Sequence, residues 1–150
     1  MKIRTARPDE RAALIELQRR AALANPGDRD VLLANPDAID TPADQFEAGN
    51  VVLAEDDTGL LGFSAICARE DGDAELDGLF VAPESWKKGI GRALVEAASA
   101  RASQLGAARL HVVGNPHAEG FYFKLGFKIT GMFATRFGDG LLMVREAEPR

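Results

Sequence analysis

The chain has 150 residues, 46% of them hydrophobic, and a formal net charge of −5 at pH 7. This length suits a single domain over residues 1–150, and one cysteine with no signal-peptide core after Met1 favours a cytoplasmic location. No apolar run is long enough to cross a membrane, and the acidic net charge argues against a general nucleic-acid binder. Neither a membrane nor a nucleic acid is therefore expected as a partner.

The first third of the chain predicts a strand, a helix and a less regular segment. A short strand is expected over residues 3–6, and Pro8 is typical of the first turn of a helix that ends near Ala24. The apolar face expected for this helix consists of Leu14, Leu17, Ala21 and Ala24. Short helices are expected over residues 29–34 and 42–48. The aspartates of that segment are interpreted as a solvated loop in preference to a rim that attracts amines.

Three consecutive strands are expected next, over residues 51–55, 60–69 and 73–81, because turn signals rich in aspartate and glycine separate them. Gly78 lies within the third of these strands, where a glycine indicates a bulge or a close approach of another backbone. Cys67 lies among small and apolar residues, which favours a buried structural thiol over a nucleophile.

A basic, glycine-containing loop follows the third strand. Pro83 ends the strand because proline has no backbone N–H to donate, and a helix is expected over residues 91–105. Glycines let the backbone approach a ligand closely, and the first N–H groups of a helix have no partners within it. Together with the positive end of the helix dipole, these groups favour a phosphate or a diphosphate. The candidate ligands are Lys87, Lys88, Gly89, Ile90, Gly91 and Arg92.

The last third of the chain predicts a strand over residues 109–113, parallel to an earlier strand because a helix connects the two. A short helix over residues 118–124 follows. The last strands are expected over residues 127–131 and 141–144, with the segment between them interpreted as a hairpin connection in preference to a mobile flap. His111 is expected to pack in the core. No group of His, Cys, Asp and Glu has the spacing of metal ligands, so no metal is expected.

Two motifs resemble signatures of the GCN5-related N-acetyltransferase (GNAT) superfamily. Residues 86–91, Trp-Lys-Lys-Gly-Ile-Gly, resemble its acyl-CoA pyrophosphate loop, Gln/Arg-x-x-Gly-x-Gly/Ala, and Trp86 departs from the pattern at the first position. Residues 115–127 resemble the second signature, Asn-x-x-Ala-x-x-Phe-Tyr-x-Lys-x-Gly-Phe, at every signature position. The motifs occur in the order of the family, and the resemblance covers nearly the whole chain.

The resemblance implies the GNAT fold, an α/β (α+β) architecture. Its sheet is mixed and mostly antiparallel, with six to seven strands, helices on both faces and a splayed parallel strand pair. The resemblance also implies acetyl-CoA as co-substrate. The backbone of Phe80 and Val81 would pair with pantetheine, and the loop from Trp86 to Arg92 would hold the diphosphate. Asn115 would contact the pantetheine arm or a water molecule near it. Lys124 would reach a phosphate or remain solvated. A homodimer through the exposed edge of the last strand is a further implication.

The chemistry of acyl transfer points to three more residues. An amine attacks a thioester only when neutral, and an alkylamine with a pKa of about 10.4 is mostly protonated at pH 7, so a base must take a proton. Glu75 and Asp77 lie two residues apart on one expected strand, so their side chains share a face. Similarity to the family favours Glu75 as the base, through water, with Asp77 as the alternative base or as a residue that orients the amine. Tyr122 falls on the family's general-acid position, and a tyrosine is still protonated at pH 7.

The function expected is transfer of an acetyl group from acetyl-CoA to a primary amine of a small molecule, by direct attack in a ternary complex. Two alternatives stay open. In the first, the acceptor is an amine of a protein or peptide. In the second, the chain is a non-catalytic acyl-CoA-binding sensor on the same fold.

Overall fold

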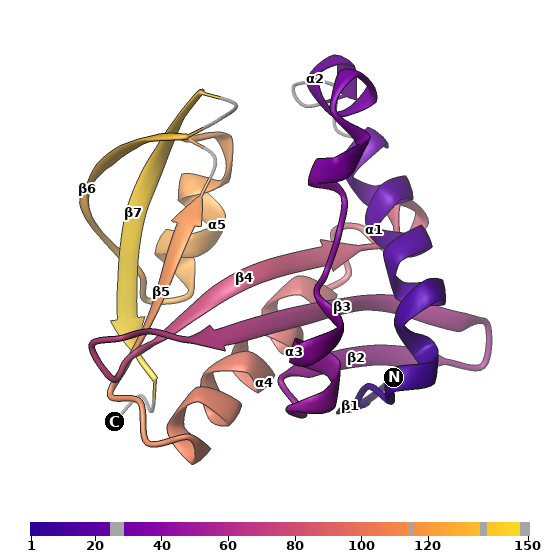
Figure 1. Ribbon diagram of the computed structural model, residues 1–150, viewed down its shortest axis with the longest axis horizontal. Helices are drawn as coiled ribbons and strands as arrows, with labels where there is room; N and C mark the ends of the chain where they lie inside the picture. The colour runs from indigo at the N-terminus through magenta and orange to yellow at the C-terminus, as the bar shows by residue number, and fades with distance from the viewer. Residues whose placement is uncertain (25–28, 115, 136–137, 148–150) are drawn as a thin grey trace. The chain divides into compact units, whose positions relative to one another are not determined.

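The computed structural model describes residues 1–24, 29–114, 116–135 and 138–147, and its strands form a seven-stranded sheet (Figure 1). The strand order is β1-β2-β3-β4-β5-β7-β6. The strands are β1 (Lys2–Thr5), β2 (Val51–Asp56), β3 (Gly59–Ala68), β4 (Ala74–Val81), β5 (Arg109–Gly114), β6 (Lys128–Thr135) and β7 (Gly138–Glu146). The pair β4–β5 is parallel, and the other pairs with a described register are antiparallel. The expected mixed, mostly antiparallel sheet is therefore confirmed.

Short 3-10 turns and α-helices connect these strands. The α-helices are α1 (Arg11–Ala24), α2 (Arg29–Ala34), α3 (Ala43–Glu47), α4 (Ile90–Gln104) and α5 (Glu119–Lys124). The 3-10 helices are η1 (Pro8–Glu10), η2 (Pro36–Ala38), η3 (Pro83–Ser85) and η4 (Pro116–Ala118). Each of these 3-10 helices begins at a proline, whose fixed φ suits a first helical turn. Across the described ranges, none of the helices combines the length and apolarity needed to cross a bilayer.

The chain groups into two compact units. Unit 1 contains Met1–Ala65 and Gly78–Ala98, and unit 2 contains Ile66–Asp77 and Ser99–Arg150. The strands β3 and β4 contribute residues to both units. The predicted residues of the diphosphate loop belong to unit 1, whereas the predicted acid and bases belong to unit 2.

In unit 1, helices cover both faces of the strands. Leu53 of β2 packs in one apolar cluster with Leu14 of α1 and Phe46 of α3. The next residue, Ala54, packs in a separate cluster with Leu94 of α4. Because successive residues of a strand point to opposite faces, α4 covers the face opposite to α1 and α3. The expected placement of helices on both faces is therefore confirmed within this unit.

The buried face of α1 differs from the expected one at two positions. Ala24 is exposed, whereas Gln18 is buried beside the predicted apolar residues. Thr41 Oγ1 donates a hydrogen bond of 2.8 Å to Gln18 Oε1, and Gln18 Nε2 donates one of 3.2 Å to the carbonyl of Asp40. A buried amide costs little when its donors and acceptors are paired, which explains this polar side chain on the helix's inner face.

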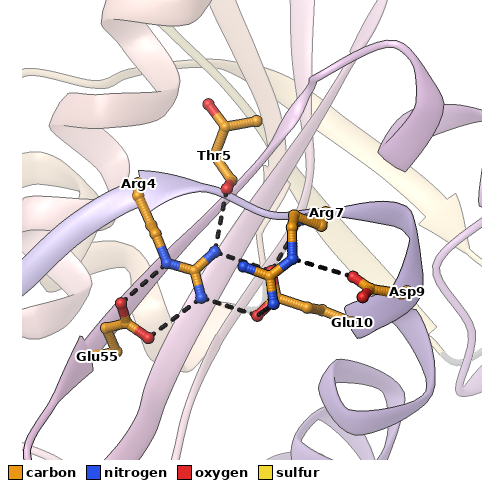
Figure 2. Close-up of polar contacts among 6 residues, drawn as sticks. All are labelled: Arg4, Thr5, Arg7, Asp9, Glu10 and Glu55. Carbon is orange, nitrogen blue, oxygen red and sulfur yellow. Dashed lines mark hydrogen bonds and ion pairs between the residues drawn. The ribbon is translucent and has the colours of Figure 1, made fainter.

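Arg4 of β1 joins carboxylates from two other elements of unit 1 (Figure 2). Its guanidinium donates two hydrogen bonds of 2.8 Å to Glu10 of η1 and one of 2.9 Å to Glu55 of β2. Glu10 also accepts a hydrogen bond of 2.9 Å from the backbone N–H of Arg7. The hydrogen bonds from Arg4 lower the pKa of Glu10 to about 2. The network therefore fixes the first helical turn against β1 and β2.

We expect Glu10→Gln to lower the free energy of unfolding at pH 7 by about 1–2 kcal/mol, after discounting the network for solvent screening. The pKa of Glu10 in the folded protein lies below its ordinary value of 4.5. The stabilisation is therefore complete above pH 4.5 and is lost as the pH falls toward about 2. Urea unfolding of both proteins over a pH series measures the difference, which should narrow in acid.

Asp9→Asn is the matched control. The carboxylate of Asp9 is 75% exposed and lies 3.2 Å from Arg7 Nε, so its loss should change the unfolding free energy by less than about 0.5 kcal/mol. Equal losses in the two variants, or a Glu10→Gln loss that does not vary with pH, would contradict this account of the network.

In unit 2, β7 pairs with β5 on one side and β6 on the other, so β6 is the edge strand. The expectation that the last strand forms the exposed edge is therefore wrong. The parallel pair β4–β5 joins Ala74 to Leu110 and Glu75 to His111, which confirms the expected parallel connection.

The last two strands are also longer than predicted. The segment expected as a connection is mostly strand, and pairing continues to Thr135 opposite Gly138. Gly131, Gly138 and Gly140 weaken the strand pattern in the sequence because glycine has low strand propensity. Cross-strand hydrogen bonds maintain the strands through these positions.

Candidate active site

The loop between β4 and α4 in unit 1 has a left-handed backbone at two positions. Lys87 has a φ of 65° and Gly89 a φ of 79°, and Lys87 is the only non-glycine residue with positive φ in the described part of the chain. This conformation costs a non-glycine residue about 1–2 kcal/mol. Left-handed residues in a turn also form the backbone concavities that bind anions. The strain therefore lies where the sequence predicts a diphosphate.

The first turn of α4 completes this anion site. Ile90, at the start of α4, is 5% exposed and packs in the apolar cluster of that helix. The N–H of Ala93 donates to the carbonyl of Gly89 at 3.2 Å, as the first bond of the helix. The N–H groups before Ala93 lack partners within the helix, as at every helix start, and favour an anion. The side chains of Lys87, Lys88 and Arg92 are exposed.

Trp86, which departs from the family pattern, ties the loop to the strand before it. Its indole N–H donates a hydrogen bond of 2.8 Å to the carbonyl of Val81 at the end of β4. The side chain is 43% exposed. Trp86 therefore holds the strand end to the loop, and its donor is engaged within the protein.

The end of β4 is held from both of its faces within unit 1. The ring of Phe80 lies 5.4 Å from that of Phe63 in the first cluster, and Val81 packs against the second. A Cβ atom at Gly62 of β3 would lie 2.6 Å from the carbonyl oxygen of Phe80. The close backbone approach predicted at Gly78 therefore occurs at Gly62, since a Cβ at Gly78 would meet only the side chains of Phe80 and Ala65.

In unit 2, the two predicted bases lie together with a thiol. One carboxylate oxygen of Glu75, one of Asp77 and the sulfur of Cys67 all lie within 4.8 Å of one another. Glu75 is partly buried and its carboxylate lies 3.4 Å from Arg69 Nη1, whereas Asp77 is exposed. The shared face predicted for the carboxylates is therefore supported. Cys67 is only partly buried, so its predicted burial is wrong, whereas its prediction as a structural thiol and not a nucleophile stays a prediction.

A surface cavity of about 440 Å³ lies beside Glu75 within unit 2. Its lining residues are Cys67, Ala68, Arg69, Glu70, Asp71 and Glu75. Three carboxylates against one guanidinium make the lining acidic, which favours a cationic guest. No sequence motif predicts this cavity, because its residues come from two strands and the turn between them.

Tyr122 on α5 is 8% exposed and is held edge-on between two aromatic rings. Its ring centroid lies 5.1 Å from that of Phe121 and 5.3 Å from that of Phe127, at interplanar angles of 75° and 76°. A Cβ atom at Gly114 of β5 would lie 3.2 Å from the Tyr122 ring. Burial raises the pKa of Tyr122 to about 12, so its hydroxyl is protonated at neutral pH.

The other predicted contacts of unit 2 are less constrained. Lys124 is exposed in the last turn of α5, which is compatible with a phosphate contact and with a solvated side chain. Asn115 lies outside the described residues.

His111 does not pack in the core as predicted. Its Nε2 lies 2.8 Å from a carboxylate oxygen of Asp73, and both side chains are partly exposed. Together with Asp71 they form a second group whose ligand atoms lie within 4.8 Å of one another. Within the described residues, two groups therefore bring three potential ligand atoms together, which the spacing of these residues along the sequence did not indicate.

Comparison with known proteins identifies the family. The model of the acetyltransferase (GNAT) domain matches residues 47–129. The chain is 32% identical over 103 residues to an uncharacterized N-acetyltransferase of Mycobacterium bovis and to two of Mycobacterium tuberculosis. This match covers 64% of the chain and 66% of each relative, so the chain spans just under two thirds of their length.

Solved structures agree with the fold. The PaiA N-acetyltransferase from Thermoplasma acidophilum in complex with coenzyme A has a TM-score of 0.75 at 21% identity, over 97% of this chain and 98% of that one. An aminoglycoside 6'-N-acetyltransferase complexed with coenzyme A has a TM-score of 0.73 at 20% identity, over 100% and 99%. The ribosomal-protein-S18-alanine N-acetyltransferase from Escherichia coli has a TM-score of 0.69 at 20% identity, over 99% and 95%. With the matching domain model, these likenesses mean that the chain belongs to the GCN5-related N-acetyltransferase (GNAT) family.

Proposed function

We propose that this protein is an acetyl-CoA-dependent N-acetyltransferase that acetylates a primary amine of a small molecule. The observation that carries the proposal is the loop before α4. Its left-handed Lys87 and Gly89 lead into a helix of 15 residues, with exposed cations on either side of the glycines. A backbone concavity, a helix N-terminus and basic side chains together suit the charge of a diphosphate. In this proposal the loop from Trp86 to Arg92 holds the diphosphate of acetyl-CoA.

The reaction requires groups that bind the thioester, remove a proton from the amine, protonate the departing thiolate and orient the amine. The backbone of Phe80 and Val81 pairs with pantetheine and holds the carbonyl oxygen as negative charge develops on it. Glu75 takes a proton from the acceptor ammonium through water, and the neutral amine attacks the thioester carbon. The tetrahedral intermediate then expels the thiolate of coenzyme A, which takes the hydroxyl proton of Tyr122. The second proton of the attacking nitrogen returns through solvent to the Tyr122 oxygen, and Glu75 releases its proton to solvent. Asp77 orients the amine or replaces Glu75 as the base.

The acidic cavity beside Glu75 supports a cationic amine as the acceptor. Glu70, Asp71 and Glu75 outnumber Arg69 in its lining, so an ammonium group is attracted there before it loses its proton. Its volume of about 440 Å³ lies within the range of small-molecule sites, which favours a metabolite over a folded protein. A flexible lysine of a protein or peptide also fits an open cavity, so this acceptor is the second candidate.

Mass spectrometry of the full chain with acetyl-CoA and a panel of diamines, polyamines, amino sugars and lysine peptides tests the proposal. We expect acetylated product and free coenzyme A in equal amounts, with small amines preferred to peptides. Product only from peptides would favour the second candidate. Coenzyme A binding without any transfer would favour the sensor.

Glu75→Gln should lower kcat/KM by about 100-fold with coenzyme A affinity unchanged, because the amide keeps the shape of the side chain but takes no proton. Steady-state kinetics with the best amine measures the loss. Glu70→Gln is the comparison: its exposed carboxylate lines the same cavity without a proposed proton-transfer role, so its loss should raise KM for the amine and leave kcat unchanged. A larger loss in Asp77→Asn than in Glu75→Gln would assign the base to Asp77.

Self-association and a cytoplasmic location remain predictions. The two edge strands of the described sheet are β1 and β6, and β6 is the edge strand of unit 2. Sedimentation analysis at several concentrations measures whether a dimer forms.

A further inference from the structure

The thiol of Cys67 lies on β3 and the carboxylates of Glu75 and Asp77 lie on β4, all within unit 2. We propose that these three groups form a binding site for a divalent transition-metal ion, Zn²⁺ above the others, and that the bound metal inhibits acetyl transfer. The site differs in composition from an acidic surface cluster because it pairs a sulfur ligand with two oxygen ligands. No bound metal is needed for the proposed transfer reaction.

The separation of the ligand atoms is close to that of a tetrahedral zinc site. The sulfur and the two carboxylate oxygens lie within 4.8 Å of one another. Zn–S and Zn–O bonds of about 2.3 Å and 2.0 Å place tetrahedral ligands roughly 3.5 Å apart. Closure therefore needs movements of about 1 Å, which rotation of the long Glu75 side chain and the exposed Asp77 side chain supplies without moving the strands.

The donor set selects the type of metal. Mg²⁺ and Ca²⁺ prefer oxygen ligands only, and a thiolate in the set disfavours them. Zn²⁺ accepts both thiolate and carboxylate and needs four ligands. Cys67 and Glu75 border the cavity of about 440 Å³, so water or an amine can reach the fourth position. Three protein ligands with one open position give an accessible site.

The charges around the site allow a metal ion to replace Arg69 as the cation beside Glu75. Arg69 Nη1 lies 3.4 Å from Glu75 Oε1, while Arg69 Nε also lies 3.2 Å from a carboxylate oxygen of Asp71. When the metal replaces Arg69 as the cation on Glu75, Arg69 keeps its contact with Asp71. The Cys67 thiol binds as thiolate, so its proton passes to solvent as the sulfur–metal bond forms. Metal affinity should therefore fall as the pH is lowered.

The consequence for catalysis rests on the proposed function. A metal bound to Glu75 occupies the carboxylate that accepts the amine's proton, and it also places a positive charge where an ammonium would bind. Micromolar Zn²⁺ should therefore inhibit transfer, and a chelator should restore it.

Spectroscopy tests the site without reference to activity. The full chain, reduced and stripped of metal, is titrated with Co²⁺ as the probe. We expect a near-ultraviolet thiolate-to-cobalt charge-transfer band that saturates at one equivalent. Cys67 is the only cysteine of the chain, so any such band comes from Cys67, and Cys67→Ser should abolish it. Asp77→Asn, at an exposed position where folding is little affected, should weaken Co²⁺ binding at least about tenfold.

His111→Gln separates this site from the neighbouring group of Asp71, Asp73 and His111, which contains no thiol. We expect the charge-transfer band to survive in this variant. Absence of the band in the wild-type chain would overturn the site. Unchanged Co²⁺ affinity in both Asp77→Asn and Glu75→Gln would also overturn it.

The activity measurement then separates the two proposals. Zn²⁺ inhibition that a chelator reverses, and that Asp77→Asn weakens, is the expected result. Full transfer by a Zn²⁺-loaded chain would overturn the inhibition. The chain stripped of metal is assayed for transfer, and a second sample is titrated with Co²⁺. Normal Co²⁺ binding together with no acetyl transfer by the stripped chain would count against the proposed function and leave the metal site supported.

Discussion

Tyr122→Phe should lower kcat by about 10²–10⁴-fold and leave the affinity for coenzyme A unchanged. The substitution removes the hydroxyl that is proposed to protonate the departing thiolate. It keeps the ring that packs edge-on between Phe121 and Phe127, so the fold should be preserved. Single-turnover kinetics with a saturating amine measures the loss, and calorimetry with coenzyme A checks the affinity.

Phe123→Leu is the control for this variant. Phe123 lies on the same helix and is 74% exposed, so its replacement should change neither turnover nor stability by a measurable amount. Wild-type turnover in Tyr122→Phe would exclude Tyr122 as the acid. Weakened coenzyme A binding would instead point to a role in holding the cofactor.

The burial of Tyr122 also predicts a pH dependence of stability. Its pKa in the folded chain is about 12, against an ordinary value of 10.0. The folded state therefore keeps this proton after the unfolded chain begins to lose it. Stability should decline as the pH rises from 10 toward about 12, and Tyr122→Phe should lack this part of the decline. Below pH 10 the group has no such effect.

Gly89→Ala should weaken coenzyme A binding by roughly tenfold, because a left-handed conformation costs alanine about 1–2 kcal/mol. Gly89 has a φ of 79°, and a Cβ atom there would meet nothing within 4 Å. The cost is therefore backbone strain without steric contact. We expect the free loop to relax toward negative φ, so that binding must restore the strain. Calorimetry with coenzyme A measures the change.

Gly59→Ala is the matched control for strain. Gly59 at the β2–β3 turn has a φ of 126°, and a Cβ atom there also meets nothing within 4 Å. Gly59→Ala should lose stability and keep its affinity for coenzyme A, whereas Gly89→Ala, whose free loop relaxes, should lose affinity and little stability. Equal affinities of the two variants for coenzyme A would show that the left-handed conformation at Gly89 does not contribute to cofactor binding.

The sequence was most informative where a single residue type is required locally. The glycine of the loop marks a left-handed position, and the three consecutive strands follow from the turns that separate them. Tyr122 could be chosen because the chain has one tyrosine and it lies in a family motif. The charge of Lys87 predicts a phosphate contact, whereas its left-handed φ is set by the loop and is not apparent from its residue type.

Features that depend on pairing between strands were predicted less well. The neighbourhood of Cys67 follows from the hairpin register, since the N–H of Arg69 donates to the carbonyl of Asp73 at 2.8 Å. Counting two residues outward from each reaches Cys67 and Glu75, which face the same side of an antiparallel pair. The turn at Asp71 therefore indicates that Cys67 and Glu75 are neighbours, but this prediction requires the register of the hairpin as well as the residue types. Gly62 was missed for the same reason, because its constraint comes from Phe80 on another strand.

The hydrogen bond from Trp86 to Val81 has a practical consequence for kinetics. Trp86 is the chain's sole tryptophan, so its emission reports on one place alone, the junction of β4 and the loop. Any ligand that moves this junction should change the emission maximum or the fluorescence intensity of the Trp86 indole. Stopped-flow fluorescence of the unlabelled protein would then time the arrival of the nucleotide separately from the chemical step.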